Sequence, residues 1–226
     1  MAVTSLALWA LYLALAFGWR TLAQLRSTGS TGFKGLSGRP GSAAWFGGAL
    51  FVCAVALGLA APVGGLAGVI GPVGVLNGQV WRLLGLALFA LGLAGTLWAQ
   101  GAMGASWRIG VDEAERTGLV TGGPFALARN PIFSAMVVAF SGLALLVPNV
   151  LALAGVGALV AAVELQVRRV EEPYLLGAHG ARYAEYASRA GRFVPGVGLL
   201  GGARRPDPVR RDAGPRPRGR SRQGRN

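Results

Sequence analysis

The sequence is poor in the residues that build disulfides, metal sites and charged surfaces. Its 226 residues include one cysteine, one histidine and only nine acidic side chains. A lone cysteine cannot close a disulfide within one chain, and together with one histidine it indicates no metal-ligand cluster. We expect Cys53, which lies in an apolar block, to be a small buried hydrophobic residue. We expect His179 to be a packing residue at a membrane interface.

Apolar residues make up 53% of the chain, and the mean hydropathy is +0.49. They come in long blocks rather than at the spacings of a soluble core, which predicts an all-α, polytopic membrane protein. Five blocks are candidate spans: residues 2–17, 43–61, 80–103, 131–147 and 150–166. A chain of this length with five spans has room for one membrane domain and excludes a separate soluble catalytic domain.

The basic residues predict how the spans are oriented. The loop after the first span holds Arg20, Arg26, Lys34 and Arg39, whereas residues 62–79 carry no charge. By the positive-inside rule the first loop is cytoplasmic, so the N-terminus is outside and the C-terminus inside. The loop after the third span then lies on the cytoplasmic side too. We expect an integral protein of a bacterial inner membrane with its polar segments facing the cytoplasm.

Two other layouts are less favoured by the residues. The first apolar block lacks the basic segment that precedes the apolar part of a signal peptide, and its positive charges follow it instead. Residues 66–76 are apolar but interrupted by Gly71 and Pro72, so we expect an interfacial or re-entrant piece rather than a sixth span.

The formal net charge of +13 is concentrated at the C-terminus. Residues 204–226 carry nine arginines and two aspartates, a net +7, in a Pro/Gly/Arg-rich stretch without apolar periodicity. We therefore expect a membrane domain over residues 1–202 and a disordered cytoplasmic tail over residues 203–226. The tail is either attracted to anionic lipid headgroups or simply solvated. No nucleic-acid partner is expected, because no aromatic residues are interleaved with the arginines to stack on bases.

Small residues recur along the third span. Gly85, Gly92, Gly95, Gly101 and Gly104 would let neighbouring helices approach closely. The last two also lie where a ligand could contact the backbone.

A polar, backbone-rich stretch follows the third span. It reads Leu119-Val-Thr-Gly-Gly-Pro-Phe125 and then Arg129-Asn-Pro-Ile-Phe133, and it is answered later by Glu171-Glu172. Glycines and a proline at this density disfavour a helix, and Pro131 suits the first turn of the fourth span. Irregular, charged sequence beside a membrane is costly unless it is buried in protein or lines a cavity, so these segments are the candidate site.

Four motifs in order resemble the isoprenylcysteine carboxyl methyltransferase family of integral membrane proteins. They are the two segments just quoted, then Glu171-Glu-Pro-Tyr-Leu175, and Gly180-Ala-Arg-Tyr-Ala-Glu-Tyr186, which is followed by Arg192-Phe-Val-Pro195. The resemblance covers residues 104–195. It implies S-adenosylmethionine as the cofactor, bound near the cytoplasmic surface, and a lipophilic or prenylated substrate that enters from the bilayer among membrane lipids.

The same resemblance implies the cofactor-binding residues, which are Thr117, Gly118, Leu119, Val120, Phe125, Asn130, Pro131, Phe133 and Glu171. Asn130 stands where the family has histidine, and Phe125 and Phe133 stand where it has tyrosines. Asparagine can still donate and accept hydrogen bonds, but it is not an acid or base near neutral pH. The phenylalanines keep the aromatic wall without the hydroxyl groups.

Charged side chains are the candidates for the chemistry. Glu171 is expected to orient the cofactor, and Glu172 either does the same or pairs with Arg129 or Arg168. Arg129 either holds the methionine carboxylate of the cofactor or extends to the interface as a topology-setting residue. Arg129 and Glu172 are the predicted catalytic pair. Glu164 and Arg168 are spaced one helical turn apart and are expected to form an ion pair.

Three functions remain open at this point. The leading one is S-adenosylmethionine-dependent methyl transfer to the polar head, a carboxylate, of an isoprenoid or other lipid. The second is a membrane sterol-type reductase that uses NADPH. The third is a catalytically degenerate membrane interaction protein of the same fold.

Overall fold

The computed structural model describes residues 1–32, 38–107 and 118–201, and every regular element in them is a helix. The α-helices are α1 (Ala2–Tyr12), α2 (Arg20–Thr28), α3 (Ala43–Leu66), α4 (Gln79–Met103), α5 (Pro131–Leu146), α6 (Val150–Gln166), α7 (Glu172–His179) and α8 (Ala181–Ala187). Two π-helical segments, η1 (Leu13–Trp19) and η5 (Val167–Glu171), and three 3-10 segments, η2 (Gly74–Leu76), η3 (Gly104–Ser106) and η4 (Gly123–Ala126), complete the set.

Within the described residues, four helices are long and apolar enough to cross a membrane: Ala2–Thr28, Ala43–Leu66, Gln79–Met103 and Val150–His179. The fourth predicted span, α5, is shorter and packs against α4 along its length. The all-α polytopic fold predicted from the apolar blocks is therefore confirmed.

The first and last long helices run further than the sequence predicted. The first continues through η1 and α2 to Thr28 and ends at Gly29, whose φ of +75° suits glycine. Arg20 and Arg26 are thus on a helix and not in a loop, which corrects the prediction. The last helix passes through η5 into α7, where Pro173 lies in the first turn and has no N–H to donate, so the wider π turn comes just before it.

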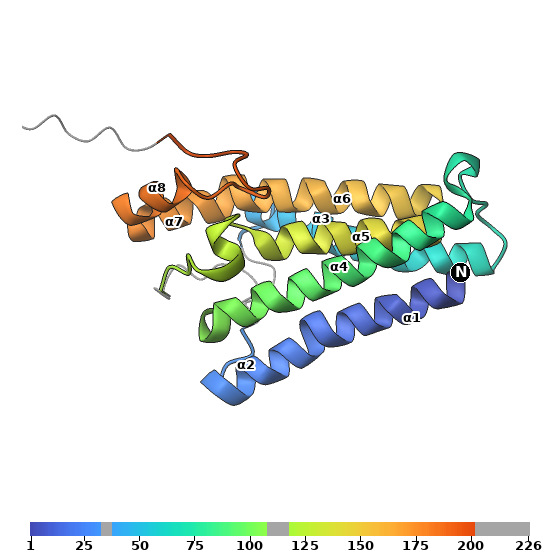
Figure 1. The fold of residues 1–226 in the computed structure, drawn as a ribbon, viewed down its shortest axis with the longest axis horizontal. Coiled ribbons are helices and arrows are strands. Elements are labelled where there is room, and N and C mark those ends of the chain that lie inside the picture. The colour runs from blue at the N-terminus through green and yellow to red at the C-terminus, as the bar shows by residue number, and fades with distance from the viewer. Residues whose placement is uncertain (33–37, 108–117, 202–226) are drawn as a thin grey trace, which may run out of the picture.

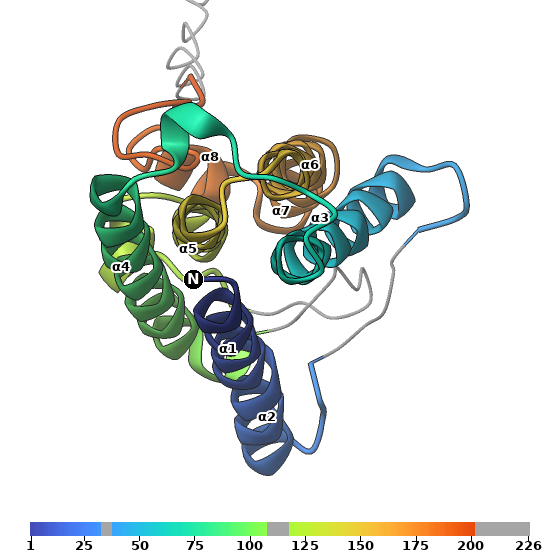
Figure 2. The same cartoon turned by 90° about the vertical axis from the view of Figure 1, so that its right-hand side faces the viewer.

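The helices pack as two close pairs, α4 with α5 and α3 with α6, while α1 lies against α3 and α5 (Figures 1 and 2). Glycines permit the first contact. A Cβ on Gly92 would come within 2.3 Å of the Ala139 nitrogen, and one on Gly85 within 2.8 Å of the Gly142 oxygen. The packing role predicted for the glycines holds at these two positions and at Gly95, whereas Gly101 and Gly104 have nothing within 4 Å of an added Cβ.

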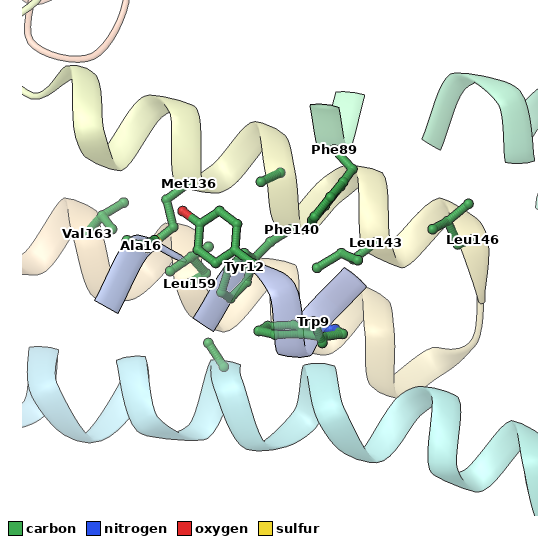
Figure 3. Packing of buried hydrophobic residues seen from close by; sticks show 12 residues of the cluster. Trp9, Tyr12, Ala16, Phe89, Met136, Phe140, Leu143, Leu146, Leu159 and Val163 are labelled. Atoms are coloured by element: carbon green, nitrogen blue, oxygen red, sulfur yellow. The ribbon is translucent and has the colours of Figure 1, made fainter. Parts of the chain in front are cut away.

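Aromatic side chains fill the space between α1, α4 and α5 (Figure 3). Trp9 packs edge-on against Phe140 with ring centroids 4.4 Å apart, and Tyr12 packs against Phe140 at 5.6 Å. The Tyr12 hydroxyl shares a buried hydrogen bond of 3.0 Å with Thr96 Oγ1. This polar contact ties α1 to α4 across the centre of the bundle.

Residues 66–76 and Cys53 test two further predictions made from the sequence. After α3 ends at Leu66 the chain forms turns and the short η2, so residues 66–76 do not add a sixth spanning helix, as expected. Cys53, predicted to be buried, is exposed on α3. An apolar block that crosses a membrane has a lipid-facing side as well as a packed side, and Cys53 is on the former.

One end of the bundle gathers the polar segments. It carries α2, residues 118–130 and residues 167–201, and we refer to it as the motif end (Figure 1). The N-terminus and the α5–α6 turn lie at the opposite end (Figure 1). The two motif segments that are distant in sequence are therefore together in space, as predicted.

Candidate functional site

Backbone hydrogen bonds join the segment before α5 to the segment after α8. Ala128 and Gly191 form an isolated parallel bridge. The Arg129 N–H donates to the Gly191 oxygen at 2.7 Å, and the Asn130 N–H donates to the Arg192 oxygen at 3.1 Å. These contacts place the start of α5 directly against the C-terminal part of the membrane domain.

The side chains that begin α5 strengthen the same junction. Asn130 Nδ2 donates to the Arg192 oxygen at 3.0 Å, and the Ser134 hydroxyl donates to the Phe193 oxygen at 2.6 Å. Pro131 occupies the first turn of the helix, as predicted, where its missing N–H costs nothing. Asn130 is thus held by a neighbouring backbone carbonyl, a contact that an asparagine makes without any change of charge.

A buried charge cluster lies beneath this junction. Arg129 Nη2 donates to Glu172 Oε1 at 2.6 Å. Arg192 donates to both oxygens of the same carboxylate, from Nε to Oε1 at 2.9 Å and from Nη2 to Oε2 at 3.0 Å. Arg129 and Glu172 are each only 6% exposed. The sequence allowed Glu172 to pair with Arg129 or Arg168, and the structure selects Arg129.

The two terminal nitrogens of Arg129 also donate to backbone carbonyls, whereas its Nε is buried without a partner among the described residues. Nη1 donates to the oxygens of Ala187 and Ala190 at 3.0 and 2.5 Å, and Nη2 also donates to the Gly198 oxygen at 2.9 Å. A guanidinium fork occupied in this way ties α5, α7 and the end of α8 together. Of the two interpretations of Arg129 made from the sequence, neither includes this set of contacts.

Two tyrosines of α8 close the cluster on one side. Tyr183 and Tyr186 are buried and stack edge-on with centroids 6.1 Å apart, and the Tyr186 hydroxyl donates to the Phe125 oxygen at 2.6 Å. Burial raises the pKa of each tyrosine to about 12. The hydrogen bond to Glu172 raises the pKa of the Arg192 guanidinium above its ordinary value. The cluster is thus arranged to keep its tyrosines neutral and its arginines charged.

Two of the predicted cofactor residues, Leu119 and Phe125, contact the tyrosine side of this cluster. Phe125 and Pro131 flank Arg129 in the chain; Phe125 is buried, while Pro131 is half-buried. Phe133 packs against the aromatic core of the bundle. Gly118 is exposed and Leu119 and Val120 are half-buried, and Leu119 contacts the tyrosine pair.

The remaining predicted residues are placed as follows. Glu171 is half-buried at the end of η5, directly before the buried Glu172. Thr117 lies outside the described residues, as does the tail 203–226. Glu164 and Arg168 form the expected ion pair on the surface of the last long helix. The π turn η5 reaches from this pair to Glu171, and such turns are frequent at functional sites.

Sequence reasoning missed three residues that build the site. Arg192, Tyr186 and Ser134 each contribute a hydrogen bond to the junction. Arg192 and Tyr186 are within the motifs quoted from the sequence, so their positions were noticed without their partners. Ser134 lies one position after Phe133 and had no signal of its own, because a serine at the start of a membrane helix usually bonds to its own backbone.

Comparison with protein-family models matches residues 80–182 to the family described as phospholipid methyltransferase. The matched segment runs from the start of α4 to the start of α8 and so includes Arg129, Glu171 and Glu172. Residues 80–182 are therefore similar to a family of membrane methyltransferases. The family resemblance drawn from the motifs is thereby confirmed. Searches of curated proteins and of solved structures each found no significant match.

Proposed function

We propose that the protein transfers a methyl group from S-adenosylmethionine to the polar head of a lipophilic substrate, with a carboxylate as the acceptor. The observation that carries the proposal is the convergence, at one end of a membrane bundle, of the two motif segments inside a methyltransferase family match. S-adenosylmethionine, when bound, supplies a methyl group on a positively charged sulfur. The protein has to hold that group, align the acceptor with it and exclude water.

The residues available for the cofactor fit its chemistry. Residues 118–123 offer backbone N–H and C=O groups, and Phe133 offers an aromatic face. Glu171 offers a carboxylate for the ammonium or the ribose hydroxyls. We assign cofactor contact to Thr117, Gly118, Leu119, Val120, Phe125, Asn130, Pro131, Phe133 and Glu171.

Arg129 and Glu172 take a different role in this proposal from the one predicted. Both terminal nitrogens of Arg129 and both oxygens of Glu172 are engaged with each other, with Arg192 or with backbone carbonyls, and only Arg129 Nε has no partner among the described residues. A side chain so engaged cannot turn to a substrate without leaving a buried charge unpaired, which costs several kcal/mol. We therefore propose that they are positioning residues, which hold the start of α5 and the end of η5 in register.

The acceptor needs little help from acid–base chemistry. A carboxylate is already ionised at neutral pH, so no general base has to be placed beside it. Alignment of the two reactants and removal of water can then supply most of the acceleration. This agrees with Asn130, which has no titratable group, standing at a position where the family has histidine.

We also propose that the motif end faces the cytoplasm of a bacterial cell. Among the described residues, the motif end carries these arginines: Arg20, Arg26, Arg129, Arg168, Arg169, Arg182, Arg189 and Arg192. The opposite end carries Arg82, at the start of α4. This asymmetry supports an N-out, C-in orientation by the positive-inside rule.

Labelling of a lipid extract tests the proposed function. Purified protein is incubated with extracted membrane lipids and S-adenosylmethionine that carries an isotope in its methyl group, and the lipid fraction is counted. We expect base-labile label, as in a methyl ester, with the wild type and at least about tenfold less with Glu171→Ala, because one charged contact to the cofactor is lost. Equal labelling by the two proteins would remove Glu171 from the site, and label that survives base would exclude a carboxylate acceptor.

A further inference from the structure

A cavity of about 580 Å³ lies between the first helix and the last turns of α4, apart from the Arg129–Glu172 cluster. Its wall includes Leu15, Trp19, Arg20, Leu97, Gln100 and Gly101. The size is that of a pocket for a small molecule or a lipid headgroup. Of the residues that the structure describes, none predicted to bind the cofactor or to carry the chemistry lines this cavity, whereas Gly101 and Gly104, where a ligand contact was considered, do.

A buried amide in the wall has an unused acceptor. Gln100 is 2% exposed, and its Nε2 donates to the Ala16 oxygen at 2.8 Å, within the π segment η1. This bond fixes which way the amide points. Its Oε1 is buried and has no hydrogen-bond partner among the described residues. An unsatisfied buried acceptor costs about 1–3 kcal/mol, so a ligand that offers a hydroxyl or N–H would recover that energy.

A cation lies beside this amide on the same wall. Arg20 Nη2 donates to the Gly104 oxygen at 2.5 Å, and the guanidinium carbon lies 4.7 Å from the centre of the Trp107 ring. Its Nε is buried and has no partner in the described part of the chain, where no acidic side chain pairs with Arg20 either. The guanidinium is thus held in place by Nη2, while its Nε–H has no acceptor among these residues. A free donor on a cation is suited to bind an anionic oxygen.

Apart from Ser27, the side chains of the remaining wall are apolar, and most of them belong to two membrane-spanning helices. Leu15, Trp19 and Leu97 line it, and Gly101 leaves it open, since nothing lies within 4 Å of an added Cβ there. A soluble anion would satisfy Arg20 but would leave this apolar surface uncovered. We propose that the cavity binds the acidic head of a membrane amphiphile that also carries a hydroxyl or N–H group. Arg20 takes its phosphate or carboxylate, Gln100 Oε1 accepts from its donor, and its chain lies along Leu15 and Leu97.

Binding of a defined probe to the purified full-length protein tests this site, and it requires neither the cofactor nor methyl transfer. The probe is phosphatidylglycerol with a fluorophore on one acyl chain, titrated into protein in neutral detergent micelles and followed by fluorescence anisotropy. Arg20→Gln removes the charge, and Gly101→Leu places a bulky side chain in the cavity from a position where an added Cβ has nothing within 4 Å. The matched controls are Arg82→Gln, an arginine at the opposite end of α4, and Gly157→Leu, a helical glycine of α6 with equally open surroundings.

We expect both test variants to weaken binding about tenfold or more and both controls to leave it unchanged. Unlabelled phosphatidylglycerol should displace the probe, and inorganic phosphate at the same concentration should not. Thermal unfolding checks that each variant is folded. The proposal is overturned if the wild type does not bind the probe or if Arg20→Gln and Gly101→Leu bind it as the controls do. It is also overturned if inorganic phosphate competes as well as the lipid.

Discussion

Arg129 and Glu172 are 43 positions apart in the chain, and their side chains meet at 2.6 Å between Nη2 and Oε1. The pair joins the segment that begins α5 to the segment that follows η5. Arg192 completes the arrangement from the other side of the carboxylate. The candidate site therefore depends on one buried carboxylate shared by two arginines, and this dependence can be measured.

Loss of either partner should destabilise the membrane domain. Arg129→Met leaves Glu172 with Arg192 alone, and Glu172→Gln leaves the buried Arg129 and the half-buried Arg192 without a carboxylate. Removing one partner of a buried pair costs about 3–5 kcal/mol. We expect a loss of this size in the free energy of unfolding, measured by denaturant titration in detergent micelles.

The surface pair Glu164–Arg168 is the control, because its side chains are 38% and 53% exposed. Arg168→Gln should cost less than about 1 kcal/mol. A loss below 1 kcal/mol for Arg129→Met as well would show that the buried cluster does not hold the site together.

Substitutions of the adjacent Glu171 and Glu172 should affect different properties, cofactor affinity for the first and stability for the second. Glu171→Gln is expected to weaken S-adenosylhomocysteine binding about tenfold or more with little change in unfolding, because a half-buried carboxylate loses only its charge. Glu172→Gln is expected mainly to lower the melting temperature of the protein. Calorimetric titration and thermal unfolding of the two variants give the comparison. The roles assigned to the two glutamates are wrong if Glu172→Gln is as stable as the wild type and Glu171→Gln binds S-adenosylhomocysteine with the affinity of the wild type.

Close packing of α4 on α5 should tolerate no methyl group at Gly92. Gly92→Ala places a Cβ 2.3 Å from the Ala139 nitrogen, and the backbone has to move to relieve the contact. We expect a loss of about 1–3 kcal/mol, seen as a lower melting temperature. Gly101→Ala is the control, since its Cβ enters open space and alanine favours a helix. Equal melting temperatures would contradict the packing described for α4 and α5.

The two tyrosines of α8 should lose their hydroxyl protons at a higher pH than exposed tyrosines do. Burial favours their neutral form, so the folded protein holds these protons up to a pKa of about 12, above the ordinary value of 10.0. The stability that they contribute is complete below pH 10 and is lost as the pH rises towards 12. Tyr186→Phe should remove one late-titrating group from a tyrosinate absorbance titration. If the difference between the two proteins appears near pH 10 with the fold intact, Tyr186 is not buried as described.

Much of the fold could be predicted because apolar blocks of membrane length carry their own signal. Pro131 at the start of α5 and the glycines that face α5 are examples in which one residue type has one strong backbone consequence. The ends of the helices were harder to predict from the sequence. Arg20 and Arg26 are typical of a loop beside a membrane, yet no glycine or proline lies between Arg20 and Thr28, so the helix continues past them to Gly29.

Side-chain partners within the site were the least predictable part. The sequence left Glu172 with two possible partners, Arg129 and Arg168. The bridge between Ala128 and Gly191 is a tertiary contact that holds the Arg129 segment in place, and the sequence pattern does not predict it. The cavity beside Gln100 had even less signal. It depends on the π segment η1, which places the Ala16 carbonyl at the Gln100 amide and leaves no trace in the apolar pattern.

Isothermal titration of the purified wild type with S-adenosylhomocysteine tests the central claim most directly, with NADPH as the comparison ligand. The proposed function predicts saturable binding of S-adenosylhomocysteine at one site per chain, weakened by Glu171→Gln, and no heat of binding from NADPH. Absence of S-adenosylhomocysteine binding by folded protein, or saturable binding of NADPH in its place, would contradict it.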